Sequence, residues 1–198
     1  NELNKSERNG VLWANQFDNI SNMNGHFNTT GPEIWAQLDE KVDGFTCAVG
    51  TGGTLAGVSK YLKEKKDNIK IFLSDPYGSA LYNYYKKDEL KAEGNSITEG
   101  IGQGRITENL KQLVVADAVR INDEEALKMI FKLLKEEGLF LGGSSGINVC
   151  GAIKMAEKLG PGHNVVTILC DSGQRYQSKI WNKGFLKSKG LPFPSWME

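Results

Sequence analysis

Histidine and cysteine are scarce in this sequence, and their scarcity limits the metal chemistry it can support. The two histidines, His26 and His163, lie far apart, and neither stands within the Cys or His spacing of a zinc site. The three cysteines, Cys47, Cys150 and Cys170, fall in apolar segments and show no paired spacing. We therefore expect no metal site, but buried, reduced thiols in a reducing compartment, either the cytoplasm or the mitochondrion.

The sequence also lacks an excess of one charge and a long apolar run. Its 24 lysine and arginine residues equal its 24 aspartate and glutamate residues, so no bulk charge favours a nucleic acid or an anionic membrane as partner. No apolar run approaches the roughly 20 residues of a membrane-spanning helix. Neither a methionine nor a signal peptide opens the chain, and residues 11–17 resemble the interior of a fold. We therefore expect a fragment of a longer protein.

The stretch from Phe45 to Gly57 combines a strand, a glycine turn and the start of a helix. Residues 45–49 form a short apolar run, which predicts a buried strand. From residue 55 onwards, apolar side chains recur at helical spacing. Between them stands Gly-Thr-Gly-Gly-Thr at 50–54, where free N–H groups and the positive end of the helix dipole would face a ligand. The pattern favours a phosphate site, although a tight turn without a ligand remains an alternative.

Two familiar phosphate motifs do not match this turn. The dinucleotide fingerprint requires a third glycine where Leu55 stands, and the nucleoside-triphosphate P-loop requires lysine where Val58 stands. A phosphate bound here would therefore belong to another cofactor.

A second glycine turn, Gly142 to Gly146, has the G-x-S-x-G pattern of a nucleophile elbow. A serine hydrolase would need an acid, which Asp171 could supply, and then a histidine later in the chain. No histidine follows Asp171, and His163 precedes it at the start of a strand. The hydrolase interpretation therefore lacks its general base. The simpler alternative is that Ser144 and Ser145 cap the following helix.

Strands alternate with helices along the chain, and the strands are continuous apolar runs. This pattern predicts an α/β fold with a twisted, mainly parallel sheet and helices on both faces. Ligands in such sheets bind beyond the carboxyl ends of the strands, where both glycine turns, Asp75 and Asp171 fall. We expect a helix within residues 1–20 and another over 31–40, with a Thr30/Glu33 capping box at its start. We expect further helices from residue 53, from Asn122 to Gly138, and from 146 to 160. We expect strands at 69–74, 114–115, 118–121, 139–141 and 165–169, and turns at 22–28.

Six motifs in sequence order resemble the cysteine synthase (O-acetylserine sulfhydrylase) and cystathionine β-synthase family. This family comprises pyridoxal-phosphate enzymes of fold type II, with the tryptophan synthase β-like fold. The motifs are Gln16-Phe17-Asp18-Asn19, His26 with Thr29-Thr30-Gly31-Pro32-Glu33-Ile34-Trp35, Gly50-Thr51-Gly52-Gly53-Thr54, Glu99-Gly100-Ile101-Gly102, Gly142-Gly143-Ser144-Ser145-Gly146, and Asp171-Ser172-Gly173-Gln174-Arg175-Tyr176.

The resemblance assigns roles to individual residues. It implies that Gly50, Thr51, Gly52, Gly53 and Thr54 hold the phosphate of pyridoxal phosphate, and that Ser144 bonds its pyridine nitrogen. Gln16 and Gly100 would lie on the substrate side, although each also has an ordinary explanation, as a helix-terminal polar residue and a turn glycine. A neutral hydroxyl at the ring nitrogen suits β-elimination and β-replacement, because the leaving group carries off the electrons.

One departure from the family is large. The Schiff-base lysine of its S-x-K-D-R-like motif has no counterpart here, nor does the loop that binds the substrate carboxylate. Lys60, Lys63, Lys65 and Lys66 are better explained as a solvated helix face. We therefore expect residues 1–18 to be the end of the smaller domain and the crossover, and residues 19–198 the larger, phosphate-binding domain. The fragment alone should be inactive.

The resemblance implies replacement of the acetyl group of O-acetylserine by sulfide. The alternatives are a cystathionine β-synthase or a non-catalytic binding and assembly module. The expected partners are the missing N-terminal half of the same enzyme, a second subunit in a homodimer, and serine acetyltransferase.

Overall fold

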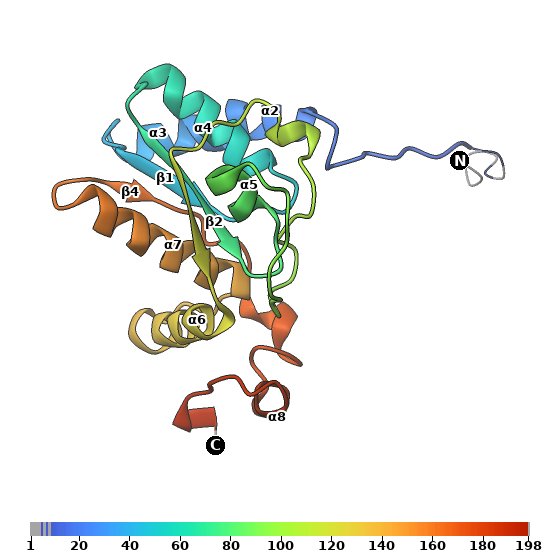
Figure 1. Cartoon of the computed structure of the whole chain (residues 1–198), viewed down its shortest axis with the longest axis vertical. Coiled ribbons are helices and arrows are strands. Elements are labelled where there is room, and N and C mark those ends of the chain that lie inside the picture. Colours follow the sequence, from blue (N-terminus) through green and yellow to red (C-terminus); the bar gives the residue numbers. More distant parts are fainter. Residues whose placement is uncertain (1–4, 6, 8, 198) are drawn as a thin grey trace.

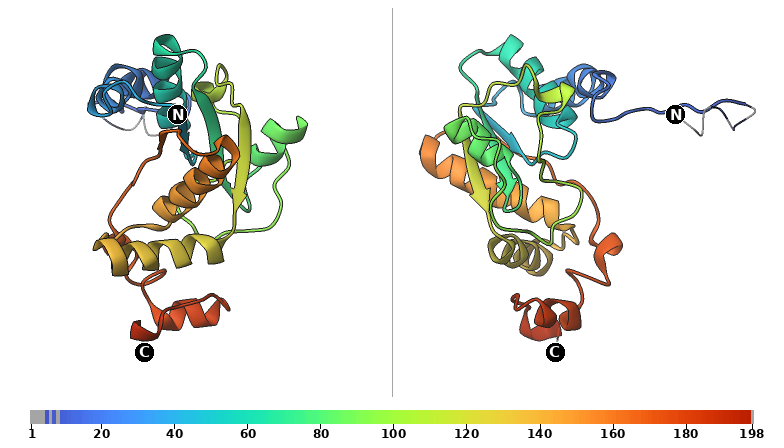
Figure 2. Two further views of the ribbon diagram at one scale, coloured as in Figure 1. Left: turned by 90° about the vertical axis from the view of Figure 1, so that its left-hand side faces the viewer. Right: turned by 45° about the vertical axis from the view of Figure 1, so that its right-hand side comes forward.

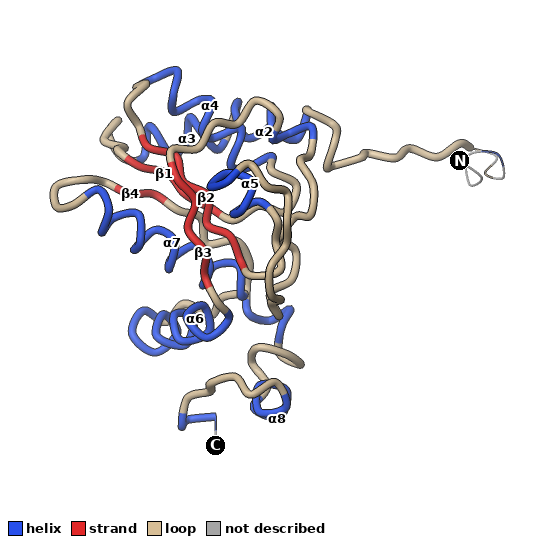
Figure 3. The backbone as a smooth tube through the Cα atoms, in the orientation of Figure 1, coloured by secondary structure: helices blue, strands red, loops and turns tan. Residues whose placement is uncertain are grey.

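Four parallel strands form the centre of the molecule, which confirms the predicted parallel sheet although the sequence predicts six strand segments. The computed structural model describes residues 5, 7 and 9–197, and its sheet has the order β3-β2-β1-β4 (Figures 1 and 3). The strands are β1 (Gly44–Cys47), β2 (Lys70–Pro76), β3 (Asp117–Ile121) and β4 (Val165–Val166), and every neighbouring pair is parallel.

Helices cover both faces of this sheet (Figure 2). They are α2 (Ser21–Asn28), α3 (Thr30–Gln37), α4 (Gly53–Lys65), α5 (Leu81–Lys87), α6 (Asp123–Glu137), α7 (Gly143–Leu159) and α8 (Lys183–Ser188). Among the described residues, none of these helices combines the length and the apolar composition needed to cross a bilayer.

The strand side chains explain the two layers, because they alternate between two separate cores. Ile71 and Leu73 pack with apolar residues of α4, whereas Phe72 packs with Ile147 and Met155 of α7. Since β2 is buried on both faces, its apolar run is nearly continuous rather than alternating with polar residues.

Helix α6 forms as its sequence predicts. The Asn122 side chain accepts the Glu125 N–H at 2.8 Å, and the Glu125 carboxylate accepts the Asn122 N–H at 3.1 Å, which completes a capping box. Gly138 ends the helix with φ +70, the left-handed conformation that glycine adopts without strain.

The sequence-based interpretation of residues 1–40 is partly wrong. Residues 10–15 form no helix, and residues 1–4, 6 and 8 lie outside the described residues. The predicted turns at 22–28 are the helix α2, which forms because its buried Met23 packs on α4. The helix over 31–40 is confirmed as α3, but without the Thr30 capping box, because α2 leads directly into α3 and the Thr30 hydroxyl bonds His26 instead.

Four predicted strands are shorter than expected or absent, and the first of them, β1, ends at Cys47 rather than at residue 49. Residues 114–115 are not in a strand, and 139–141 contributes one isolated bridge, between Leu141 and Ser172. Strand β4 ends at Val166 rather than at residue 169. It stops there because the side-chain amide of Asn148, from α7, lies between the chain after β1 and the chain after β4. This amide accepts the Ala48 N–H and donates to the Ile168 carbonyl oxygen, each at 2.7 Å.

Asp75, at the end of β2, should make stability depend on pH. It is fully buried, and burial raises its pKa to about 6, against an ordinary 3.8. The folded protein then binds the proton more tightly than the unfolded chain, so this stabilisation is present below pH 4 and is lost as the pH rises to 6. We expect Asp75→Asn, which can still accept the Tyr82 N–H, to remove this loss.

Urea unfolding at several pH values tests this expectation. Between pH 4 and 6, the unfolding free energy of the wild type should fall relative to that of the variant by up to about 1.4 kcal/mol per pH unit. Parallel pH profiles for the two proteins would show that Asp75 does not titrate in this range.

Candidate functional site

A cavity of about 510 Å³ lies at the carboxyl edge of the sheet, between the two glycine turns. The first turn, the loop at 99–101, the start of α7 and the segment at 170–176 all contribute to its wall. The lining residues are Ala48, Gly50, Thr51, Gly52, Thr54, Leu55, Glu99, Gly100, Ile101, Ser144, Cys170, Asp171, Arg175 and Tyr176. Thr54 and Ser144, which are 90 positions apart in the sequence, therefore face one common space.

The first turn has the geometry of an anion cradle. Gly52 precedes α4 with φ +90, a conformation that favours glycine, and it has no side chain to cap the helix. The first N–H groups of any helix lack partners within the helix and attract an anion. A Cβ on Gly50 would overlap the carbonyl oxygen of Gly100. Glycine is thus required at 50 and 52 for the backbone to form this wall of the cavity.

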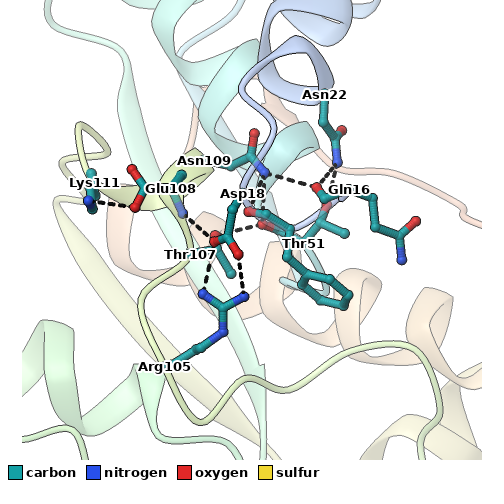
Figure 4. A network of polar contacts seen from close by, with 10 residues as sticks. Gln16, Asp18, Asn22, Thr51, Arg105, Thr107, Glu108, Asn109 and Lys111 are labelled. Atoms are coloured by element: carbon teal, nitrogen blue, oxygen red, sulfur yellow. Dashed lines mark hydrogen bonds and ion pairs between the residues drawn. The ribbon is translucent and has the colours of Figure 1, made fainter. Parts of the chain in front are cut away.

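Thr51 is held in this cradle from two sides, as Figure 4 shows. The Asn22 amide of α2 donates to the Thr51 hydroxyl at 2.9 Å, and the Thr107 hydroxyl donates to the Thr51 carbonyl oxygen at 2.7 Å. These bonds fix both the side chain and the peptide of Thr51, so that the turn is ordered before any ligand binds.

The loop that precedes α2 is fastened to the segment that supplies Thr107. Arg105 donates to both carboxylate oxygens of Asp18 at 2.9 Å, and the Glu108 N–H donates to the same carboxylate at 3.2 Å (Figure 4). The hydrogen bonds from Arg105 lower the pKa of Asp18. Asn109 adds a bond to the Phe17 carbonyl at 2.8 Å. Because the Arg105–Asp18 ion pair is partly exposed, it should contribute little to stability. We infer that its main role is to align the loop before α2 with the segment that supplies Thr107.

The Thr54 hydroxyl has a histidine neighbour. His26 Nε2 lies 3.1 Å from Thr54 Oγ1, and His26 Nδ1 lies 2.9 Å from Thr30 Oγ1. Burial lowers the pKa of His26, which favours the neutral ring near pH 7. Helix α2 therefore contacts both threonines of the cradle, through Asn22 and His26.

The second turn presents Ser144 to the cavity from the first turn of α7. Ser145 does not line the cavity, and its hydroxyl accepts the Cys170 N–H at 3.0 Å. Gly142 donates to the Asp171 carbonyl at 2.9 Å, and a Cβ on Gly142 would overlap the Asp171 carboxylate. Neither serine caps α7, whose capping residue is Gly142, so the capping alternative is wrong.

Among the residues that the structure describes, His163 is not near Ser144, as the hydrolase interpretation would require. Ser144 is in the first turn of α7, whereas His163 follows the last turn and lies 3.1 Å from the Gly160 carbonyl. A helix of 17 residues is about 25 Å long, which separates this imidazole from the serine. The arrangement does not support a triad.

Polar side chains of the 170–176 segment surround the mouth of the cavity. The Tyr176 hydroxyl donates to Asp171 at 2.8 Å, and burial, followed by this carboxylate, raises the pKa of Tyr176. Arg175 is largely exposed, with its guanidinium 3.8 Å from the same carboxylate. Cys170 is exposed, contrary to the expectation that all three thiols are buried, because it lies in the cavity wall after β4 has ended.

Three residues that the sequence places near the site are not in the cavity wall. Gln16 is exposed, and its backbone oxygen, rather than its side chain, accepts from Asn22 (Figure 4). Gly53 starts α4, where a Cβ would overlap Asn22. Asp75 is buried at the end of β2. Conversely, the sequence gives no role to Asn22, whose importance depends on a helix that the local sequence does not predict.

Comparison with known proteins agrees with this geometry. The family described as "Pyridoxal-phosphate dependent enzyme" matches residues 2–171. Cysteine synthase 1 of Neurospora crassa is 52% identical over 186 residues, which cover 91% of this chain and 50% of the relative. Cysteine synthase 1 of Emericella nidulans is likewise 52% identical, with 91% and 50% coverage.

The fold also has a solved counterpart. The crystal structure of an O-acetylserine-dependent cystathionine β-synthase from Helicobacter pylori superimposes with a TM-score of 0.81 at 35% identity, covering 90% of this chain and 56% of that one. The chain thus spans about half the length of the curated relatives it matches. From its matched family, its motifs and its fold, the chain belongs to the pyridoxal-phosphate-dependent enzymes and is a homologue of the cysteine synthases.

Proposed function

We propose that this chain is the phosphate-binding portion of a pyridoxal-phosphate-dependent cysteine synthase. The complete enzyme would replace the acetyl group of O-acetylserine by sulfide and release cysteine and acetate. The observation that carries the proposal is that both glycine turns line one cavity, with the Thr54 cradle and the Ser144 hydroxyl on the same space. The similarity to proteins named cysteine synthase supports the substrates.

The cavity fits the cofactor in its donor set. The N–H groups and hydroxyls of Gly50, Thr51, Gly52 and Thr54, which line the cavity, are suited to a phosphate dianion, and the glycines leave the backbone accessible to it. Ser144, which is 6% exposed, offers one neutral hydroxyl for the pyridine nitrogen. The bound cofactor would supply an electron sink, and a hydroxyl in place of a carboxylate would leave its ring nitrogen unprotonated.

We further propose that residues 1–18 belong with the smaller domain and the crossover, and residues 19–198 with the larger domain. In Figures 1 and 2, residues 9–15 extend away from the body of the molecule. Leu12 is 95% exposed and Trp13 is 74% exposed, which is unusual for large apolar side chains outside an interface. The N-terminal half of the same enzyme is the partner we assign to this segment, and it would bring the Schiff-base lysine.

The chain as given should not bind the cofactor covalently at one site, because its sequence contains no S-x-K-D-R motif. After incubation with pyridoxal phosphate and reduction with borohydride, mass spectrometry should find no stoichiometric adduct on a single lysine. A full-length relative such as the Neurospora crassa enzyme serves as the positive control. One lysine of this chain labelled in every molecule would contradict the proposal.

Complementation tests the reaction itself. We expect cysteine to form from O-acetylserine and sulfide when this chain is mixed with the lysine-bearing N-terminal half of a full-length relative, and neither half to be active alone. Homocysteine in place of sulfide as the second substrate tests the alternative, a cystathionine β-synthase, which is the activity named for the similar Helicobacter pylori structure. Failure of complementation, with stable binding of the other half or of a serine acetyltransferase C-terminal peptide, would favour a binding and assembly module. Light scattering of the assembled protein tests the proposed homodimer.

A further inference from the structure

His26 connects two threonines that come from different helices. It lies on α2, and its ring nitrogens contact Thr30 Oγ1 of α3 at 2.9 Å and Thr54 Oγ1 of α4 at 3.1 Å. Thr54 lines the cavity, whereas Thr30 does not. The imidazole of His26 therefore does not line the cavity itself, but it contacts the Thr54 hydroxyl, which does.

The direction of these two hydrogen bonds determines what Thr54 can do. A neutral imidazole donates through one nitrogen and accepts through the other, and a hydroxyl has one proton to donate. If Nε2 is bare, Thr54 donates its proton to the ring and turns only lone pairs toward the cavity. If Nε2 carries the proton, Thr54 accepts from the ring and keeps its own proton for an anion.

We propose that His26 is a positioning residue of the anion cradle, held as its Nε2–H tautomer by Thr30. The Thr30 hydroxyl donates to Nδ1, the Nε2–H donates to Thr54 Oγ1, and the Thr54 hydroxyl donates to a phosphate oxygen. The inference rests on the proposed function, because it takes the ligand of the cradle to be a phosphate monoester.

Two further observations fix the position and the charge of the ring. Helix α2 is packed closely on α4, since a Cβ on Gly57 would overlap the Met23 carbonyl oxygen and come within 2.7 Å of the His26 Cβ. The ring therefore has little freedom to move away from Thr54. Burial also lowers the pKa of His26, so the ring is neutral near pH 7 and one nitrogen must accept.

Nuclear magnetic resonance can determine the tautomer of His26, because the chain has two histidines and their signals can be told apart. Long-range ¹H–¹⁵N spectra of the ¹⁵N-histidine-labelled chain should show the proton of His26 on Nε2. His163 is an internal contrast, since its Nδ1 lies 3.1 Å from the Gly160 carbonyl, which can only accept, so its proton should be on Nδ1. The His163→Gln variant assigns the two sets of signals. A protonated Nδ1 with a bare Nε2 on His26 overturns the proposal.

Phosphate binding tests the consequence for the ligand. Inorganic phosphate and pyridoxal phosphate are titrated separately against the wild type and against His26→Leu, His26→Gln, Thr54→Val and the double variant His26→Leu/Thr54→Val. A hydrogen bond to a charged oxygen corresponds to about tenfold or more in affinity, so His26→Leu and Thr54→Val should each lose about that factor. The double variant should lose no more than Thr54→Val alone, because His26 acts only by orienting the Thr54 hydroxyl toward the phosphate.

Matched variants separate positioning from folding. Gln can place an amide donor near the position of Nε2, so His26→Gln should stay within about threefold of the wild type, and His163→Leu should leave the affinity unchanged. Losses for His26→Leu and Thr54→Val that simply add would overturn the proposal. A wild-type chain that binds no phosphate would instead overturn the proposed function, while the tautomer of the free chain still decides the role of His26.

Discussion

Replacing Asn148 with leucine should lower the free energy of unfolding by about 3 kcal/mol or more, although leucine has nearly the same size. The side chain is 1% exposed, and its amide satisfies Ala48 N–H and Ile168 C=O, both at 2.7 Å. Leucine would leave both backbone groups without these partners, and each buried unsatisfied group costs about 1–3 kcal/mol.

The substitution should also affect the cavity. Asn148 stands where β1 and the chain after β4 diverge, and Ala48 and Cys170 beyond this point line the cavity. We expect the phosphate affinity of the folded variant to fall, because the two walls are no longer held at a defined separation.

Urea unfolding measures the loss, with Asn28→Leu as the control. Asn28 is exposed at the end of α2, and a surface substitution there should change stability by no more than about 0.5 kcal/mol. An Asn148→Leu variant as stable as the control would show that the amide bridge between Ala48 and Ile168 does not stabilise the fold.

Replacing Gly57 with alanine should destabilise the protein by about 3 kcal/mol and weaken phosphate binding by about tenfold. The added Cβ would overlap the Met23 carbonyl oxygen, which belongs to backbone and cannot rotate away. Helix α2 would have to move off α4, carrying Asn22 away from Thr51 and His26 away from Thr54.

Gly25→Ala is the matched control, since Gly25 is also helical and a Cβ there would meet no atom within 4 Å. Alanine is the better helix former, so this variant should gain about 0.5–1 kcal/mol and bind phosphate like the wild type. Thermal unfolding and phosphate titration of both variants give the comparison. A Gly57→Ala protein with unchanged affinity would show that the position of α2 does not control the cradle.

Local signals explain which parts of the fold were predictable. Helix α6 has its capping box, its apolar stripe and its terminal glycine within one stretch of sequence, and it forms between Asp123 and Glu137. The first glycine turn likewise contains its own strand end, turn and helix start. Elements that contain their own start and stop signals can be read without knowing what they pack against.

Elements stabilised by distant contacts were not predictable. Residues 21–28 look like turns because they are mostly polar, yet they form α2, which gains its stability from packing on α4 and from an Asn109 side chain that accepts the Met23 N–H. Strand β4 ends early for a similar reason. After Val166, the side chain of Asn148, which comes from α7, takes the place of the backbone hydrogen bonds between β1 and β4.

By itself, the sequence determined the α/β class, the family, and the two turns that line the cavity, because glycine, serine and threonine at fixed spacings are required where backbone forms the wall of a site. Only the tertiary structure decided how that wall is held. Asn22, His26, Asn109 and Asn148 act through side-chain hydrogen bonds across 20 or more positions of sequence, and such bonds leave no local periodicity or spacing to recognise.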